Sequence, residues 1–180
     1  MIIARKKRKE NISEYLLYMW QVEDLIRAAD CNMDNIRKLI LNRYEVDEPT
    51  RQEIETWYQE LTDMMLTEGV RESGHLNINR IVMMELEDLS KELLADPKQT
   101  IYTSLYYQVL PAIIQLREKN GGNNAGEIET CFNAVYGYLT LRLQNKLVSE
   151  DTQKSIKQIS TFLAMLADRF KHRDDVIEEE

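Results

Sequence analysis

The stretch NINRIVMMELEDLSKELLADP, residues 77–97, decides the class of fold. Its apolar residues recur three and four positions apart, which is the spacing of one face of an α-helix. Asp96 and Pro97 then start the next helix, because a proline in the first turn of a helix loses no hydrogen bond. The inner face of this helix is expected to hold Ile78, Ile81, Val82, Met84, Leu86, Leu89 and Leu93.

Similar spacing predicts helices through the rest of the chain, so the fold class is expected to be all-α. The further expected helices cover about 11–29, 33–44, 47–70, 97–119, 125–146 and 149–171. Only six glycines and three prolines interrupt the chain, and strand-type alternation never persists. We therefore predict a single-domain bundle of six or seven helices. Its first helix is apolar on more than one side and is expected to lie centrally.

Pro111 falls inside the apolar run of the helix expected at 97–119. Proline removes a backbone donor and clashes with the preceding turn, so we expect a kink near Pro111 or a break into two shorter helices. The run Gly121-Gly122-Asn123-Asn124 is the one evident loop of low complexity. The spacing from Asn124 to Glu127 suits a capping box at the start of the next helix.

Length, charge and composition set the expected organisation of the chain. Its 180 residues suffice for one ordinary domain, and we expect a basic arm at 1–9, a helical bundle at 10–172 and an acidic tail at 173–180. The net charge of −8 disfavours non-specific binding of nucleic acid by the domain as a whole. No apolar run approaches the roughly 20 residues that a membrane span needs. Nothing resembles a secretory signal, so the two cysteines are expected to be reduced, in a cytoplasmic protein.

Residue patterns that hold metals or act as nucleophiles are sparse. A di-metal carboxylate site in a bundle needs two Glu-x-x-His pairs, and the chain offers one, Glu72 to His75, past Gly74 at a helix end. We interpret His75 as an exposed loop residue. Cys31 and Cys131 lie in apolar surroundings with no histidine near them in sequence, which favours buried structural thiols. No catalytic residue, metal or cofactor is therefore predicted, and a non-enzymatic role is favoured over an enzyme.

The helix expected at 11–29 sets polar residues among large apolar ones. They are Gln21, Glu23, Asp24 and Arg27. At least one of them should approach the core and require a partner, and Glu23 can pair with Arg27 four residues on. We interpret the four as a polar network that locks helix packing. The alternative is a pocket for a small ligand or an enzyme site, which would add His75 or Tyr106.

A basic run precedes that helix. It comprises Arg5, Lys6, Lys7, Arg8 and Lys9. The helix dipole disfavours cationic charge at a helix start, so these residues are candidates for contact with nucleic acid or another anionic partner. The alternative is a disordered arm that solvates the terminus or pairs with the acidic tail.

Tyrosines are numerous in the helices expected at 97–119 and 125–146. They are Tyr102, Tyr106, Tyr107, Tyr136 and Tyr138. Tyr102 and Tyr106 share a helix face and Tyr107 lies off it, so not all of them can enter one core. Tyrosine rings left at the surface favour a protein interface, and half-buried packing is the alternative. The function we predict is accordingly self-association or contact with another protein.

The opening segment RKKRKENISEYLLYMWQVEDLIR, residues 5–27, resembles the start of a bacterial family of domains of unknown function. The rest of the chain is similar to that family in length and in helical pattern. The resemblance implies a cytoplasmic, bacterial, all-helical protein. It supplies no functional residues.

Overall fold

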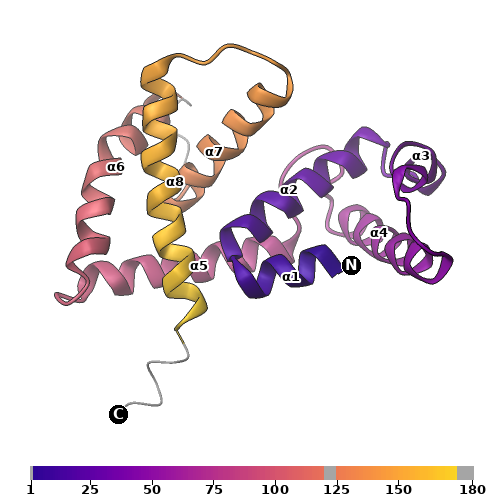
Figure 1. The fold of residues 1–180 in the computed structure, drawn as a ribbon, viewed down its shortest axis with the longest axis horizontal. Helices are drawn as coiled ribbons and strands as arrows, with labels where there is room; N and C mark the ends of the chain where they lie inside the picture. The colour runs from indigo at the N-terminus through magenta and orange to yellow at the C-terminus, as the bar shows by residue number, and fades with distance from the viewer. Residues whose placement is uncertain (1, 120–124, 174–180) are drawn as a thin grey trace. The chain divides into compact units, whose positions relative to one another are not determined.

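The structure, a computed structural model, describes residues 2–119 and 125–173. These residues form eight α-helices and one short 3-10 helix, with no strand among them (Figure 1). The elements are α1 (Ile2–Glu10), α2 (Ile12–Ala28), α3 (Met33–Leu39), η1 (Leu41–Arg43), α4 (Glu48–Thr67), α5 (Asn77–Ala95), α6 (Thr100–Lys119), α7 (Glu127–Leu143) and α8 (Glu150–Lys171). The all-α prediction is confirmed. The predicted count of six or seven helices is wrong because the basic run is itself helical, as α1.

The helices gather into two compact units. Of the described residues, 2–10 and 14–81 form the first unit, and 11–13, 82–119 and 125–173 form the second. Helix α5 therefore contributes residues 77–81 to the first unit and its remainder to the second. The single bundle expected over residues 10–172 stays a prediction, and the acidic tail from residue 174 lies outside the described residues.

Side-chain caps explain several of the helix starts. Asn32 precedes α3, and its Oδ1 accepts hydrogen bonds from two backbone N–H groups at 2.9 and 3.2 Å. Asp47 caps α4 in the same way, with Pro49 in the first turn as predicted. Ser149 caps α8. Gly69, at a φ of +71°, follows the last turn of α4, where the left-handed conformation suits glycine.

Helix α7 begins with a cap that its neighbours in sequence do not supply. Its N-cap residue, Gly126, has no side chain, and Glu87 of α5 provides the acceptor instead. The Oε1 atom of Glu87 accepts hydrogen bonds from the N–H groups of Ile128 at 2.9 Å and Glu129 at 3.1 Å. A Cβ atom at position 126 would overlap that carboxylate, so a larger residue there would displace the Glu87 side chain from the helix start. Asn124, the first residue of the expected capping box, lies outside the described residues.

Burial is the main influence on the Glu87 carboxyl. It raises the pKa of Glu87 above the ordinary value, and the two N–H donors of α7 act in the opposite direction. The helix start is therefore capped by a group that is more easily protonated than a surface glutamate.

The core of the first unit is built around α2. This helix is buried on more than one side, as predicted, and its buried side chains include Tyr15, Leu16, Met19, Trp20, Val22, Glu23 and Ile26. Helix α3 packs against α4. These two helices add Ile36, Tyr58, Leu61 and Met65 to the core.

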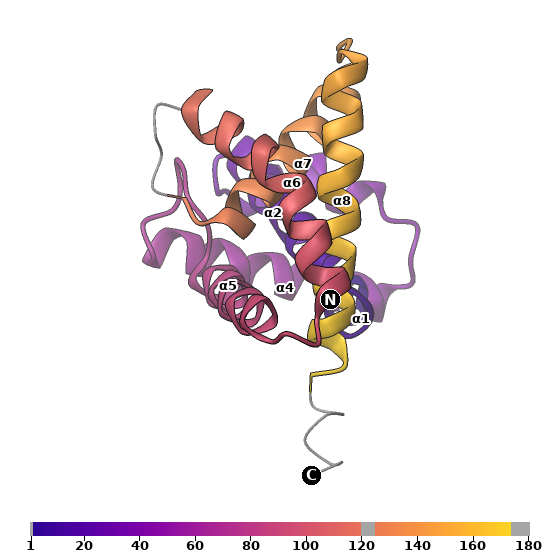
Figure 2. The same cartoon turned by 90° about the vertical axis from the view of Figure 1, so that its left-hand side faces the viewer.

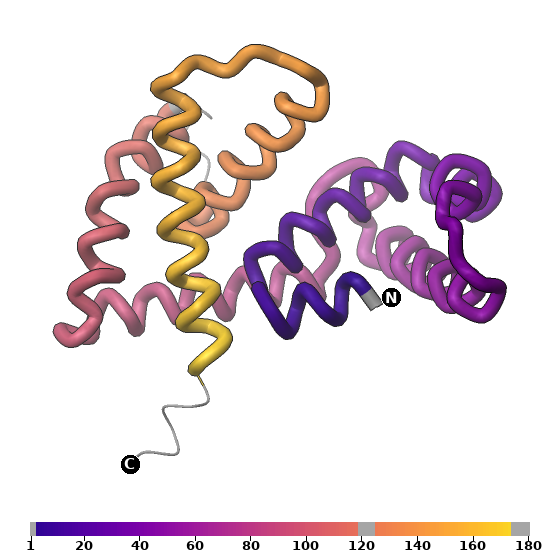
Figure 3. The backbone as a smooth tube through the Cα atoms, viewed as in Figure 1, coloured from indigo at the N-terminus to yellow at the C-terminus, as the bar shows by residue number. Residues whose placement is uncertain are grey.

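The core of the second unit lies among its last three helices. Helix α8 packs against both α6 and α7, and the tube in Figure 3 shows it running between them. Their buried side chains include Val109, Ile113, Ile128, Phe132, Ile159, Phe162 and Leu166. Tyr102 is buried with them, and its hydroxyl donates to Ser90 Oγ at 2.7 Å.

Two expectations about α5 and α6 need correction. Helix α6 continues through Pro111, so the chain does not break there, and the kink stays a prediction. In α5, Ile81 and Met84 are 55% and 64% exposed, although we expected them on the inner face. Each residue turns the helix by about 100°, which places both of them away from the buried row of Val82 and Leu86.

Candidate functional site

Polar residues of α2 meet the connection between α4 and α5 inside the first unit. Glu23 is fully buried there. Its Oε1 accepts hydrogen bonds from the Leu76 backbone N–H at 3.0 Å and from the Asn79 side-chain amide at 2.7 Å. Its Oε2 lies 2.6 Å from Nδ1 of His75. Each oxygen of this buried carboxylate therefore has a polar partner, as a charged group in a core requires.

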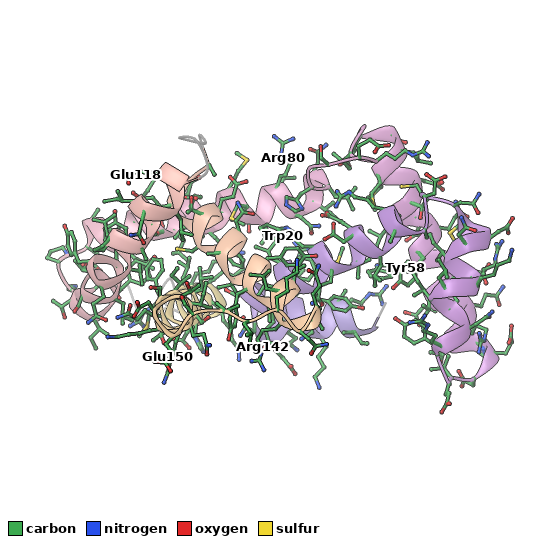
Figure 4. The ribbon with its side chains drawn as sticks, turned by 90° about the horizontal axis from the view of Figure 1, so that it is seen from above. Trp20, Tyr58, Arg80, Glu118, Arg142 and Glu150 are labelled. Carbon is green, nitrogen blue, oxygen red and sulfur yellow. The ribbon has the colours of Figure 1, made fainter. Side chains whose placement is uncertain are left out.

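His75 is half-buried, with 29% of its side chain exposed, so the exposed position that we expected is wrong. The cause is its contact with α2. The imidazole ring stacks on the indole of Trp20, with ring centroids 4.2 Å apart and planes 12° from parallel. Figure 4 labels Trp20 among the side chains of the first unit. The stacked indole and the Glu23 carboxylate together fix the position of the imidazole.

Arg27 pairs with Asp24 and not with Glu23, which corrects the predicted ion pair. Its Nη1 lies 2.8 Å from Oδ1 of Asp24, because the Glu23 carboxylate is turned into the core toward other partners. The same guanidinium donates to the backbone carbonyl oxygens of Val70 and Gly74. Arg27 thus links the connection between α4 and α5 to α2 through these hydrogen bonds.

Two further candidate residues lie outside the α2 cluster, which comprises Trp20, Glu23, Asp24, Arg27, His75 and Asn79. Gln21 is half-buried and makes no hydrogen bond to the cluster residues. Tyr106 belongs to the second unit, where its hydroxyl donates to Glu127 at 2.9 Å. Burial and that hydrogen bond raise the pKa of Tyr106 to about 12.

The geometry of the α2 cluster is better suited to holding α2 against the connection between α4 and α5 than to catalysis. A general base must reach the proton of a substrate, and the carboxylate of Glu23 is fully buried with both oxygens engaged. Within residues 2–119 and 125–173, no group of three or more His, Cys, Asp or Glu side chains could hold a metal ion. No helix in this part of the chain is long and apolar enough to cross a membrane.

The predicted basic residues lie on α1, and several have partners within the first unit. Lys7 Nζ lies 2.7 Å from the Glu14 carboxylate, and Lys6 Nζ lies 4.0 Å from the Glu10 carboxylate. The guanidinium of Arg8 lies over the ring of Tyr15, 5.6 Å from its centroid. Carboxylates of the same unit therefore lie beside Lys6 and Lys7, two of these five basic residues.

The remaining two basic residues differ in their surroundings. Lys9 is exposed, whereas Arg5 joins Arg8 in the lining of a pocket of about 240 Å³. The pocket is also lined by Tyr15, Met19, Trp57, Glu60 and Met64. Glu60 places a carboxylate in the same lining as the two arginines, which lowers the net attraction for an anion.

Both cysteines are free and buried, as predicted. Cys131 is fully enclosed in the second unit, and burial raises the pKa of its thiol to about 12. Burial also raises the pKa of Cys31 in the first unit. Neither thiol has the lowered pKa that an activated nucleophile requires.

A family model described as Domain of unknown function (DUF4924) matches residues 1–176. The chain belongs to this family. The predicted resemblance to a family of domains of unknown function is thereby confirmed, and DUF4924 covers almost the whole chain. No curated protein and no solved structure matches it. Membership in DUF4924 assigns no activity, so a function has to be argued from the geometry.

Proposed function

We propose that the protein acts by self-association through the outward face of α6. The exposed residues of this helix recur at spacings of three and four, so they form one stripe along it. The stripe comprises Thr100, Ile101, Ser104, Tyr107, Gln108, Pro111, Ile114 and Gln115, and the exposed Glu118 follows it in the last turn of α6. Figure 2 shows α6 crossing in front of α7 on that side of the second unit.

The near absence of charge on this stripe is the observation that carries the proposal. Residues 100–116 contain no Asp, Glu, Lys or Arg, although 30% of the chain is charged. Three of the large apolar side chains are well exposed, Ile101 at 63%, Tyr107 at 64% and Ile114 at 50%. Exposed apolar side chains along one helix, free of charge, are typical of a contact surface.

Symmetry favours a second copy of the chain as the partner. In a twofold dimer the same patch lies on both sides of the interface, so a charge near the twofold axis meets its own copy. Two chains that each carry a net charge of −8 also repel one another. An uncharged helix face is therefore the surface on which two copies can approach at least cost.

Pro111 adds a polar group to the same stripe. Because proline has no N–H, the backbone carbonyl of Tyr107, four residues earlier, lacks its helical donor. Pro111 is exposed, so this carbonyl lies on the outward side. In a dimer it can accept a hydrogen bond from the side-chain amide of Gln108 or Gln115 of the second copy.

Light scattering of the full chain at low and high salt tests the proposal. We expect a dimer mass at both salt concentrations, because the contacting face is uncharged and screening affects it little. Replacing Tyr107 by aspartate, Tyr107→Asp, places a charge where it meets its copy and should give the monomer mass.

The matched control is Leu147→Asp, which introduces the same charge at a fully exposed leucine in the connection between α7 and α8. That variant should remain a dimer. A monomeric wild-type chain, or a Tyr107→Asp variant that stays dimeric, would overturn the proposal. Contact of α1 with an anionic partner, and a ligand pocket beside α2, stay predictions.

A further inference from the structure

A pocket of about 260 Å³ lies among α6, α7 and α8 in the second unit. Its walls are mostly apolar or small, and include Leu116, Ala134, Gly137, Tyr138, Leu141 and Ile156. A concave, largely apolar site with a few polar groups is the usual form of a small-molecule site. The pocket is separate from the α2 cluster and uses a side of α6 other than the exposed stripe.

Gly137 leaves the α7 side of this pocket open. It lies in the interior of α7, where glycine costs about 0.5–1 kcal/mol relative to alanine. A Cβ atom built at this position meets nothing within 4 Å. Gly137 is exposed, so this open space is continuous with solvent, and another molecule can lie against α7 there.

Arg117 supplies the charged group of the pocket. Its Nη2 donates to the backbone carbonyl of Ala125, and its Nε is buried without a hydrogen-bond partner among the described residues. Within residues 2–119 and 125–173, no carboxylate forms an ion pair with this guanidinium. A part-buried arginine without a carboxylate partner favours an anion, which a guanidinium can bind through two parallel hydrogen bonds.

We propose that this pocket binds a small carboxylate that carries an apolar tail. The carboxylate pairs with Arg117, and the tail lies along Ala134 and Gly137 toward Leu141. Asn133 is exposed and also lines the pocket, and its side-chain amide, which makes no hydrogen bond within the described part of the chain, can donate to the second carboxylate oxygen. The site does not depend on self-association, since it requires only one copy of the chain.

Amide NMR spectra of the ¹⁵N-labelled full chain test the proposal with three probes of equal length, octanoate, octanol and octylamine. Octanoate should shift the amide signals of residues around Gly137. Octanol should bind about tenfold more weakly, because it lacks the charge that pairs with Arg117, and octylamine more weakly still. Equal binding of the three probes, or no binding of octanoate at millimolar concentration, would overturn the proposal.

Two variants separate the roles of charge and space. Arg117→Gln should lower octanoate affinity about tenfold, and Gly137→Leu should abolish binding by filling the pocket. The control for charge is Lys157→Gln, at an exposed position of α8, which should leave binding unchanged. If Arg117→Gln does not fold, Gly137→Leu decides alone, because its side chain enters open space. Unchanged octanoate binding in a folded Gly137→Leu variant would place the ligand elsewhere.

Discussion

Glu23 accepts hydrogen bonds from two donors and faces His75, all inside the first unit. Glu23→Ala leaves the Leu76 N–H and the Asn79 amide buried without an acceptor. We expect it to lower the free energy of unfolding by about 3 kcal/mol. Glu23→Gln keeps an acceptor at Oε1 and should cost about half as much, since it loses only the charge beside His75. Urea denaturation measures both, and equal losses would show that the acceptor at Oε1 contributes little.

The raised pKa of Glu87 leads to a prediction about how the stability of the protein depends on pH. Because its folded pKa is raised above the ordinary value of 4.5, the folded state binds the proton more tightly than the unfolded state. The stabilisation from that proton is complete below pH 4.5 and is lost as pH rises through the folded pKa. Glu87→Gln stays neutral and still accepts from α7. Its stability relative to the wild type should therefore increase from pH 4 to pH 7.

The control for this prediction is Glu92→Gln, at an exposed glutamate of the same helix. Its stability relative to the wild type should change little over the same range. Urea denaturation of the three proteins at both pH values gives the comparison. A Glu87→Gln variant that loses stability toward neutral pH would mean that the charged carboxylate is the better cap.

At the scale of residues, the sequence predicts which side chains need partners but not the partners themselves. The polar residues of α2 stand out among large apolar neighbours, whereas His75 lies 52 positions away from Glu23. Glu87 and Gly126 show the same limit. A capping side chain normally lies beside the helix start in sequence, whereas here it comes from another helix. A glycine at the N-cap position is therefore the one local sign that the acceptor must come from elsewhere in the chain.

At the scale of elements, Pro111 makes α6 less stable than its length suggests. Proline inside a helix costs about 3 kcal/mol relative to alanine, through the lost hydrogen bond and the clash with the preceding turn. We expect Pro111→Ala to raise the free energy of unfolding by about 1–3 kcal/mol, with a higher midpoint in thermal denaturation. Gln158→Ala, at an exposed position of α8 outside the stripe on α6, should change it by less than about 0.5 kcal/mol. An unchanged or lower midpoint in Pro111→Ala would mean that α6 is already adapted to the proline.

Helix positions were predictable because apolar spacing and caps act locally. The helices α2 to α8 lie close to their expected ranges, and Asp47 with Pro49 marks the start of α4 as predicted. Helix α1 was missed because a run of basic residues carries no apolar period. Helix α7 is shorter than expected at both ends, and its start depends on Glu87 of another helix.

At the scale of the whole molecule, one buried cysteine lies in each unit, so its reaction with a thiol reagent can be used to follow the unfolding of that unit. Burial raises the pKa of both thiols, that of Cys131 to about 12, so neither should react with a thiol reagent at pH 8 until its unit opens. We expect Cys31→Ala and Cys131→Ala variants, each with one thiol left, to label at the same urea midpoint. The reason is that α5 belongs to both units and cannot unfold in one alone. Two distinct midpoints would show that the units open independently.

The division into two units was not visible in the sequence. The apolar period of residues 77–95 runs without interruption across the boundary after Ile81, so it predicts one helix, and α5 is one helix. The same period gives no sign that the two parts of this helix belong to different units. Residues 11–13, which include the first two residues of α2, likewise belong to the second unit, although α1 and the rest of α2 belong to the first.

That placement of residues 11–13 affects how the chain folds during its synthesis. Ser13 donates its hydroxyl to the backbone carbonyl of Leu163, a residue 150 positions later in the chain. A ribosome adds about 5–20 residues per second, so Ser13 waits on the order of 10 s for this partner to be synthesised. During that interval the nascent chain exposes Ile12 and Ser13 beside helices that can already fold. Ile12 and Ser13 are therefore among the last residues to reach their final environment.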